Sequence, residues 1–335
     1  MTAIRLLIQP VLWIVSLGYY IGLNLHRRSI VAKKVSVPVI SIGNITTGGT
    51  GKTPAILNII RIFADEMKTS VITRGYGRKT RGLIEVSSGD NVDRAGDEAL
   101  LIKKKNPAVT VIAGANRYKS AKKAIEKGAE LLVLDDGFQS WEIERDLDII
   151  MIDCTCPFGG GLLPYGRLRE PVSALSRAEG VVLNRSNMVE DSEIRKIEDC
   201  IKKYNPDIKI FYAIERIKHF KRIAGEEIVA AEEFAGSRVL CFSGIGNPAG
   251  FYYLLNELKV DIIKRIKRKD HYIWTQKDID EIIKTAASED LKVLTTEKDA
   301  ARLPEAGNLD AWTLVMELEI RDNENWMEFI HEIKN

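Results

Sequence analysis

The sequence predicts an α/β fold: a mostly parallel sheet with helices on both faces, a smaller second α/β domain and an N-terminal membrane-associated helix. Through residues 37–213, short apolar segments rich in β-branched residues alternate with apolar patterns at helical spacing, which is typical of parallel sheets. A second run of strand and helix patterns follows residue 233, and residues 3–25 are strongly apolar. These observations divide the chain into an N-terminal helix at 1–30, a first domain at 31–213, a linker at 214–233 and a second domain at 234–335.

Composition places the chain among ordinary globular proteins. It has 335 residues, 45% of them hydrophobic and 29% charged, which is enough for two domains of usual size. The formal net charge of +2 predicts no nucleic-acid partner. Of four cysteines, only Cys154 and Cys156 are close, and no second pair completes a zinc site, so we expect reduced thiols in a cytosolic compartment. We also expect a monomer.

The apolar segment at residues 3–25 predicts attachment to a membrane. A helix of this length could just cross a bilayer, but Arg5, Gln9 and Pro10 weaken that interpretation. The basic cluster that begins at His26 favours a cytoplasmic face with anionic headgroups. An amphipathic helix in the interface, a signal peptide and a core helix are the alternatives. The prediction is therefore a membrane surface as partner, with either peripheral or single-span attachment.

A phosphate-binding P-loop is the central prediction for the first domain. The strand at residues 37–42 leads into a glycine-rich turn, then Gly51-Lys52-Thr53 and a helix, and this is the context of a P-loop NTPase-like fold. Glycine N–H groups can wrap a phosphate, Lys52 can reach the outer phosphates, and Thr53 can ligate Mg²⁺. Thr46 stands where the usual motif begins with glycine. The residues expected to bind ATP are Thr46, Thr47, Gly48, Gly49, Thr50, Gly51, Lys52 and Thr53.

Charged residues follow the later strands of this domain. The strand at 70–73 precedes a basic loop, Asp97 and Glu98 open a probable helix, and the strand at 131–134 ends in Asp135 and Asp136. The carboxyl ends of parallel strands meet at one edge, so the last two acids would lie beside the P-loop and could hold Mg²⁺. On their own, a basic turn is usually solvated and an acid at a helix start is usually a cap. Further strands are expected at 109–113, 148–153, 180–183 and 208–213, with helices at 116–127 and 191–203.

The second domain offers one candidate for catalysis. Strands are expected at 239–242, 293–295 and 313–320, and a helix after Pro248. His271 follows an aspartate in a turn-like, aromatic stretch, and only four histidines occur in the chain. A lone histidine is more often structural than catalytic, so spacing alone leaves its role open.

Nine motifs in order resemble one protein family. They are TTGGTGKTP, TRGYGRK, GDEALL, LDDGFQ, RDLDII, LLPYGRLREP, FSGIGNP, DHYIWT and TTEKDAARL. No single motif is decisive, but the ordered set is similar to that of tetraacyldisaccharide 4'-kinase, the lipid A kinase of bacterial outer-membrane biogenesis. The resemblance runs from the N-terminal segment to about Leu303.

The resemblance implies an inner-membrane kinase with its site on the cytoplasmic side. Its substrates would be ATP, with Mg²⁺, and the 4'-hydroxyl of a lipid A disaccharide 1-phosphate. It implies that Asp97 takes the hydroxyl proton, that His271 pairs with Asp97, and that Lys52 stabilises the transferring phosphoryl group. Thr53 with Glu98, Asp135 or Asp136 would serve Mg²⁺. The residues implied around the substrate are Arg74, Gly75, Tyr76, Arg78, Asn116, Arg117, Gln139, Arg169 and Glu170.

Three positions depart from the family pattern, and two other functions stay open. Ser140 and Tyr272 stand where the family often has histidine, and Arg167 where it often has proline. These departures affect fine geometry more than the reaction. A P-loop ATPase or GTPase switch is one alternative, for which the Thr296-Glu297-Lys298-Asp299 stretch is only a partial guanine signature. A soluble small-molecule kinase, with the first helix in its core, is the other.

Overall fold

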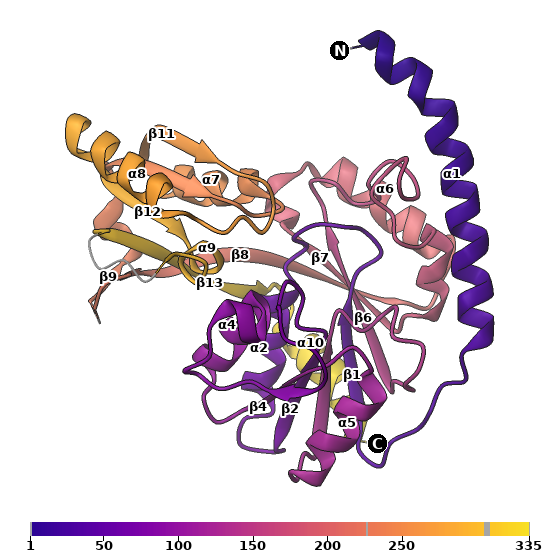
Figure 1. Ribbon diagram of the computed structural model, residues 1–335. Coiled ribbons are helices and arrows are strands. Elements are labelled where there is room, and N and C mark those ends of the chain that lie inside the picture. Colours follow the sequence, from indigo (N-terminus) through magenta and orange to yellow (C-terminus); the bar gives the residue numbers. More distant parts are fainter. Residues whose placement is uncertain (1, 226, 305–308, 335) are drawn as a thin grey trace.

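A computed structural model, which describes residues 2–225, 227–304 and 309–334, places helices around one long mixed sheet (Figure 1). The strands are β1 Val39–Gly43, β2 Thr69–Thr73, β3 Ile84–Glu85, β4 Thr110–Ala113, β5 Leu131–Asp135, β6 Leu147–Asp153, β7 Gly180–Asn184, β8 Lys209–Arg222, β9 Ile228–Ala230, β10 Arg238–Ser243, β11 Asp261–Lys267, β12 Lys292–Thr296 and β13 Ala311–Ile320. The helices are α1 Thr2–Ser29, α2 Lys52–Ile62, α3 Val92–Ala95, α4 Asp97–Lys105, α5 Arg117–Glu126, α6 Asp191–Lys202, α7 Pro248–Glu257, α8 Gln276–Glu289, α9 Glu297–Ala300 and α10 Asn323–His331.

The sheet has the mostly parallel character that the sequence predicts. Its order is β11-β10-β12-β13-β8-β7-β6-β1-β5-β2-β4-β3, with β9 paired to β8. Strands β4, β2, β5, β1, β6 and β7 and the first half of β8 are parallel to their neighbours, and so are β13, β12, β10 and β11. Antiparallel pairing joins β8 to β13 and adds the short strands β3 and β9. Strands β3, β9 and β11 were not expected from the sequence.

A continuous strand occupies the first half of the linker predicted at 214–233. Residues 209–213 of β8 pair with β7, and residues 213–222 pair antiparallel with β13. This ribbon carries charge pairs across its strands, including Arg216 with Glu319, and Lys218 with Glu317 at 3.7 Å. A half-exposed antiparallel ribbon of this kind has a mixed and charged sequence, which explains why no strand is predicted beyond residue 213.

The C-terminal helix α10 returns to the first part of the sheet, although the sequence analysis assigned it to the second domain. Trp326 is fully buried and its Nε1 donates to Asn58 Oδ1 of α2 at 3.0 Å. Its ring stacks edge-on against Phe211 of β8, with centroids 5.0 Å apart. The last helix therefore completes the core beneath the predicted P-loop helix.

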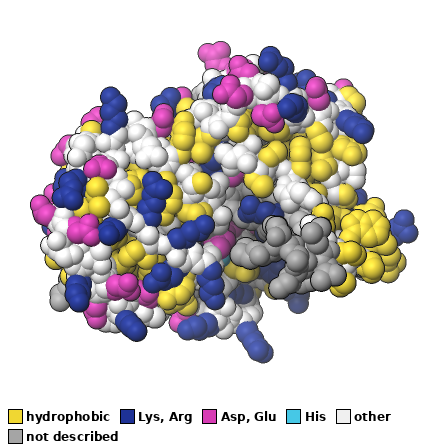
Figure 2. Space-filling view, turned by 90° about the horizontal axis from the view of Figure 1, so that it is seen from above, with side chains coloured by type: hydrophobic (Ala, Val, Ile, Leu, Met, Phe, Trp, Pro, Cys, Tyr) yellow, Lys and Arg dark blue, Asp and Glu magenta, His cyan; other side chains and the backbone are white. Residues whose placement is uncertain are grey.

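Helix α1 runs along one side of the molecule, and its start extends beyond the body (Figure 1). One face touches the loop at 162–169, where the Ser16 hydroxyl donates to Leu162 O at 3.1 Å and the Tyr19 hydroxyl donates to Arg169 O at 2.8 Å. The rest exposes large apolar side chains: Val11, Trp13, Ile14, Val15, Leu17, Tyr20, Ile21 and Leu25. Figure 2 shows hydrophobic side chains gathered at one edge of the molecule. Within the described residues, no helix combines the length and the hydropathy needed to cross a bilayer.

Candidate active site

The predicted phosphate-binding loop leaves β1 and enters α2 at the carboxyl edge of the parallel strands. Gly48 and Gly51 have φ of 117° and 94°, left-handed values that glycine adopts without steric cost. Lys52 begins α2 and is 8% exposed, and Thr53 is buried beside it. The N-terminus of α2 thus directs its N–H groups and its partial positive charge toward the loop, as phosphate binding requires.

The tip of the loop is anchored to the arginine-rich loop that follows β6. Thr46 forms an isolated bridge with Leu168, and the Thr47 N–H donates to Arg167 O at 2.7 Å. Within the loop, Asn44 Nδ2 donates to the Thr50 hydroxyl at 3.1 Å. Thr46 is therefore part of the anchor, which accounts for a residue other than glycine at the start of the loop.

Two aspartates at the end of β5 lie beside Lys52. Asp136 contacts Lys52 Nζ at 3.4 Å and Arg169 Nη1 at 2.6 Å. Burial alone would raise the pKa of Asp136, but these two cations lower it to about 2. Asp135 accepts from the Thr73 hydroxyl at 2.8 Å, and burial, reinforced by Glu98 and Asp136, raises its pKa to about 7. The β5 end thus holds one firmly ionised carboxylate and one that is close to protonation at neutral pH.

These oxygens suit a Mg²⁺ ion. Asp135 Oδ1 is buried with no hydrogen-bond partner among the described residues, and Thr53, with its hydroxyl, lies in the first turn of α2. Mg²⁺ is commonly held by one or two carboxylates together with substrate phosphates. No cluster of three or more His, Cys, Asp and Glu side chains gathers for a metal in the described part of the chain. Asp135, Asp136 and Thr53 therefore fit Mg²⁺ held jointly with a nucleotide.

Asp97 and His271 meet across the two parts of the sheet. Asp97 begins α4, His271 lies in the loop after β11, and His271 Nδ1 is 3.2 Å from Asp97 Oδ2. Arg302 completes the group, because its Nη2 donates to Asp97 and lies 3.1 Å from His271 Nδ1. Asp97 and Arg302 are buried. The Tyr76 ring packs at a tilt against the His271 ring, with a centroid distance of 5.0 Å.

The charges of this trio alter one another. Burial would raise the pKa of Asp97, but the hydrogen bond from His271 and the charge of Arg302 hold it well below its usual range. The Asp97 hydrogen bond in turn raises the pKa of His271, against burial and the Arg302 charge. Asp97 is thus ionised at neutral pH, while the pKa of His271 lies above its ordinary value.

Glu98 is engaged by a second cation from the same segment as Arg302. Lys298 Nζ of α9 contacts Glu98 Oε1 at 2.5 Å, and its charge lowers the pKa of Glu98. Glu98 also lies within the electrostatic range of Lys52 and Asp135. Two cations of the second part of the sheet, Lys298 and Arg302, therefore hold the two acids that open α4.

The predicted substrate residues fall into three groups. Arg74 and Tyr76 are exposed beside buried Gly75, and Arg169 pairs with Asp136, so these line the open side of the site. Gln139 donates to buried Glu170 at 2.9 Å, and Arg177 also pairs with that carboxylate at 3.0 Å, so Gln139 and Glu170 belong to a polar cluster around this carboxylate. Arg78, Asn116 and Arg117 bond internal groups: Arg78 to Ala113 O and Gly82 O, Asn116 to Lys119 N, and Arg117 to Gly114 O and Asp135 O.

Sequence reasoning missed three arginines, Arg177, Arg185 and Arg302. Arg302 lies in the TTEKDAARL motif, so the motif contained the signal without assigning a role to it. Arg185 Nη1 reaches the carbonyl of Gly49 in the P-loop at 3.0 Å from the end of β7. Nothing in the local sequence around Arg177 or Arg185 indicates these contacts, because they depend on which strands are neighbours.

Comparisons with known proteins agree with the motifs. The family model described as tetraacyldisaccharide-1-P 4'-kinase matches residues 5–334. A protein of Halothermothrix orenii named tetraacyldisaccharide 4'-kinase is 37% identical over 287 residues, covering 80% of this chain and 75% of that protein. A protein of the same name from Syntrophobacter fumaroxidans is 34% identical and covers 94% of this chain and 84% of its own length.

A solved structure has the same fold. The crystal structure of LpxK from Aquifex aeolicus, described as a complex with ATP, is 27% identical and superposes with a TM-score of 0.74. The match covers 97% of this chain and 99% of that one. The chain therefore belongs to the tetraacyldisaccharide-1-P 4'-kinase family, and the resemblance stated from its motifs is confirmed.

The contact between Asp97 and His271 makes a prediction for titration. Asp97→Asn removes the group that chiefly raises the pKa of His271, while burial and Arg302 continue to lower it. The pKa of His271 should therefore fall below its value in the unmodified protein. NMR titration of the ring protons measures this, and His271→Gln identifies the signal among the four histidines. An unchanged pKa would show that the two side chains are not in contact.

Proposed function

We propose that this family member transfers the γ-phosphoryl group of ATP to the 4'-hydroxyl of a tetraacylated lipid A disaccharide 1-phosphate where α2, α4 and the loop after β11 meet. The names of its relatives and the ATP complex of the related structure support the two substrates. The observation that carries the proposal is the 3.2 Å contact of Asp97 with His271, at the same sheet edge as the Lys52 loop.

The Asp97–His271 pair supplies the base. As the bond between the 4'-oxygen and the γ-phosphorus forms, the bond from that phosphorus to the β,γ-bridging oxygen breaks, and the hydroxyl proton must leave. Asp97 accepts a hydrogen bond from the hydroxyl and orients it. Asp97 alone is a weak base because the hydrogen bond from His271 and the charge of Arg302 lower its pKa, and His271, with a raised pKa, shares the proton. The pair therefore acts as one unit.

Lys52 and Arg169 supply the positive charge. Both contact Asp136. A triphosphate offers more negative charge at the same place, so Lys52 would move from Asp136 to the outer phosphate oxygens. Arg169, about a quarter exposed, would face the acceptor with Arg74 and Tyr76.

Asp135, Asp136 and Thr53 would hold Mg²⁺, with Glu98 as a further candidate that must first leave Lys298. When bound, Mg²⁺ neutralises charge on the phosphoryl oxygens. Asp135 is the residue most affected by such a charge, because burial holds its pKa at about 7. A nearby cation favours its ionised form.

The exposed face of α1 would place the site at the cytoplasmic surface of the inner membrane. The basic residues His26, Arg27 and Arg28 end the same helix. An apolar face with a basic end is typical of helices that lie in the interface of an anionic bilayer. The acceptor is a lipid, so attachment of the enzyme brings the site to its substrate.

The first prediction for this function concerns the P-loop. With γ-labelled ATP, Mg²⁺ and lipid A disaccharide 1-phosphate in detergent, the unmodified protein should label the lipid. Lys52→Ala should lose at least about a hundredfold in rate, because one positioned charge contributes that order of transition-state stabilisation. If ATP is hydrolysed while the lipid stays unlabelled, the proposed acceptor is wrong, and the result favours a P-loop ATPase or GTPase switch.

The second prediction concerns pH. Protonated His271 cannot take up a further proton, so kcat/KM should fall on the acid side with a midpoint above about 6.5, the ordinary value for histidine. In His271→Gln the residual activity depends on Asp97, whose pKa is low, so this acid limb should move to lower pH. The pH–rate profiles of both proteins measure the shift. An acid limb at the same pH in both would exclude His271 from the pair.

The third prediction concerns α1. Ile14 and Ile21 are 65% and 52% exposed, so Ile14→Glu with Ile21→Glu should leave the fold intact and reduce binding to anionic phospholipid vesicles by at least about tenfold. Co-sedimentation with vesicles measures binding. Ile228→Glu, at an equally exposed position on β9, is the matched control. Unreduced binding by the double variant would mean that another surface attaches the protein.

A further inference from the structure

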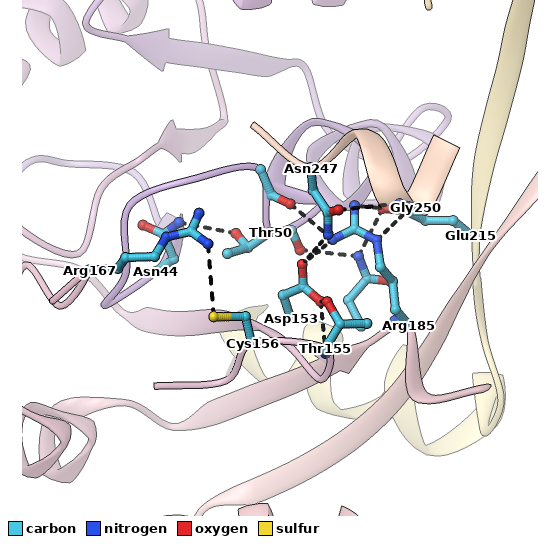
Figure 3. Close-up of polar contacts among 12 residues, drawn as sticks. Asn44, Thr50, Asp153, Thr155, Cys156, Arg167, Arg185, Glu215, Asn247 and Gly250 are labelled. Atoms are coloured by element: carbon cyan, nitrogen blue, oxygen red, sulfur yellow. Dashed lines mark hydrogen bonds and ion pairs between the residues drawn. The ribbon is translucent and has the colours of Figure 1, made fainter. Parts of the chain in front are cut away.

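The carbonyl groups of the P-loop are held from outside the loop. Thr50 O accepts from Asn184 Nδ2 at 3.1 Å and Gly49 O accepts from Arg185 Nη1 at 3.0 Å, in the cluster around Thr50 and Arg185 of Figure 3. Thr47 O accepts from Arg167 Nη2 at 2.9 Å. A loop that binds phosphate needs its N–H groups directed inward. Donors that hold the carbonyls outward favour that orientation before any nucleotide is present, which reduces the ordering cost of binding.

Arg185 is the most firmly held of these donors. Its Nε and Nη2 form two bonds of 3.1 Å with the Glu215 carboxylate of β8, and its Nη1 also donates to Asp153 at the end of β6. Its backbone is left-handed, with φ of 59°, and its side chain is 8% exposed. A guanidinium has five N–H groups. These contacts and the Gly49 bond use four of them, so Arg185 is committed to the loop and to its two carboxylates rather than to a ligand.

The same cluster reaches helix α7 in the second part of the sheet. Asp153 Oδ2 accepts from Asn247 Nδ2 at 2.8 Å, and Asn247 caps α7 by accepting from Gly250 N at 3.2 Å. Figure 3 shows Asn247 and Gly250 beside the Arg185 side chain. The approach is close, because a Cβ on Gly250 would lie 3.0 Å from Arg185 Nε. A Cβ on Gly246 would likewise lie 3.0 Å from the Gly49 nitrogen.

We propose that Arg185 is a positioning residue for the nucleotide site: it fixes the Gly49 carbonyl outward and, through Asp153 and Asn247, links the P-loop to the seating of α7. Nucleotide affinity then depends on contacts made by a helix that is far from the P-loop in sequence. This inference rests on the proposed nucleotide site. It adds a connection between the two parts of the sheet that does not pass through Asp97 or His271.

Arg185→Lys tests the first half of the proposal. Lysine keeps a positive charge between Asp153 and Glu215 but lacks the fork that also reaches Gly49. We expect ATP to bind at least about tenfold more weakly in equilibrium measurements, since a lost hydrogen bond to a charged group has that order of effect. In the absence of nucleotide, hydrogen exchange in the peptide 44–55 should also be faster in Arg185→Lys than in the unmodified protein. A folded Arg185→Lys protein with unchanged ATP affinity and unchanged exchange would overturn the proposal.

Asn247→Ser tests the link to α7. Serine still caps the helix but is too short to reach Asp153, so the fold is preserved and one contact is lost. We expect ATP affinity to fall several-fold. The matched control is Asp322→Ser, which exchanges the N-cap of α10 in the same way. This control variant should bind ATP with the affinity of the unmodified protein. If Asn247→Ser binds ATP as tightly as Asp322→Ser, the link between the P-loop and α7 is absent. This comparison also decides the proposal if Arg185→Lys does not fold.

ATP binding and hydrogen exchange are measured without the lipid acceptor. Failure of the proposed kinase reaction would therefore appear as an unlabelled lipid with normal ATP affinity in the unmodified protein. Failure of the inference would appear as unaltered ATP affinity in Arg185→Lys and Asn247→Ser, while the unmodified protein labels the lipid normally.

Discussion

The antiparallel ribbon of β8 and β13 is the element on which the rest of the structure depends. Strand β8 pairs with β7 along its first residues and with β13 along the remainder, so a single strand belongs to both parts of the sheet. The parallel strands of both parts end at loops that face each other. The P-loop, Asp97 and the β5 acids come from one part, and His271, Lys298 and Arg302 come from the other.

Ion pairs hold these facing loops together. The buried pair of Asp97 with Arg302 and the partly exposed pair of Glu98 with Lys298 each join α4 to the second part of the sheet. Removing one partner of a buried pair such as Asp97–Arg302 leaves an uncompensated charge, at a cost of about 3–5 kcal/mol. The charges that alter the pKa values of Asp97 and His271 therefore also fix the relative position of the two parts of the sheet. The electrostatics of the proposed catalytic pair and the arrangement of the two parts have the same physical origin.

Helix α1 is connected to the site through a single loop. The backbone carbonyl of Arg169 accepts from Tyr19 of α1, and the side chain of Arg169 contacts Asp136 beside Lys52. Helix α1 thus contacts Arg169, the residue that pairs with Asp136. A lipid acceptor delivered along α1 would arrive at the side of the site where Arg74, Tyr76 and Arg169 are accessible.

The sequence by itself determined the parallel character of the sheet, the P-loop and the family, because these depend on local patterns such as β-branched runs, glycine spacing and short ordered motifs. It placed Asp97, Lys52 and the β5 acids at strand ends and helix starts. Only the tertiary structure decided that residues 214–222 continue a strand, that α10 covers the first part, and that Arg185 and Arg302 contact the site. Those facts depend on which strands become neighbours, and pairing between residues that are far apart in the sequence leaves no periodic signal in the chain.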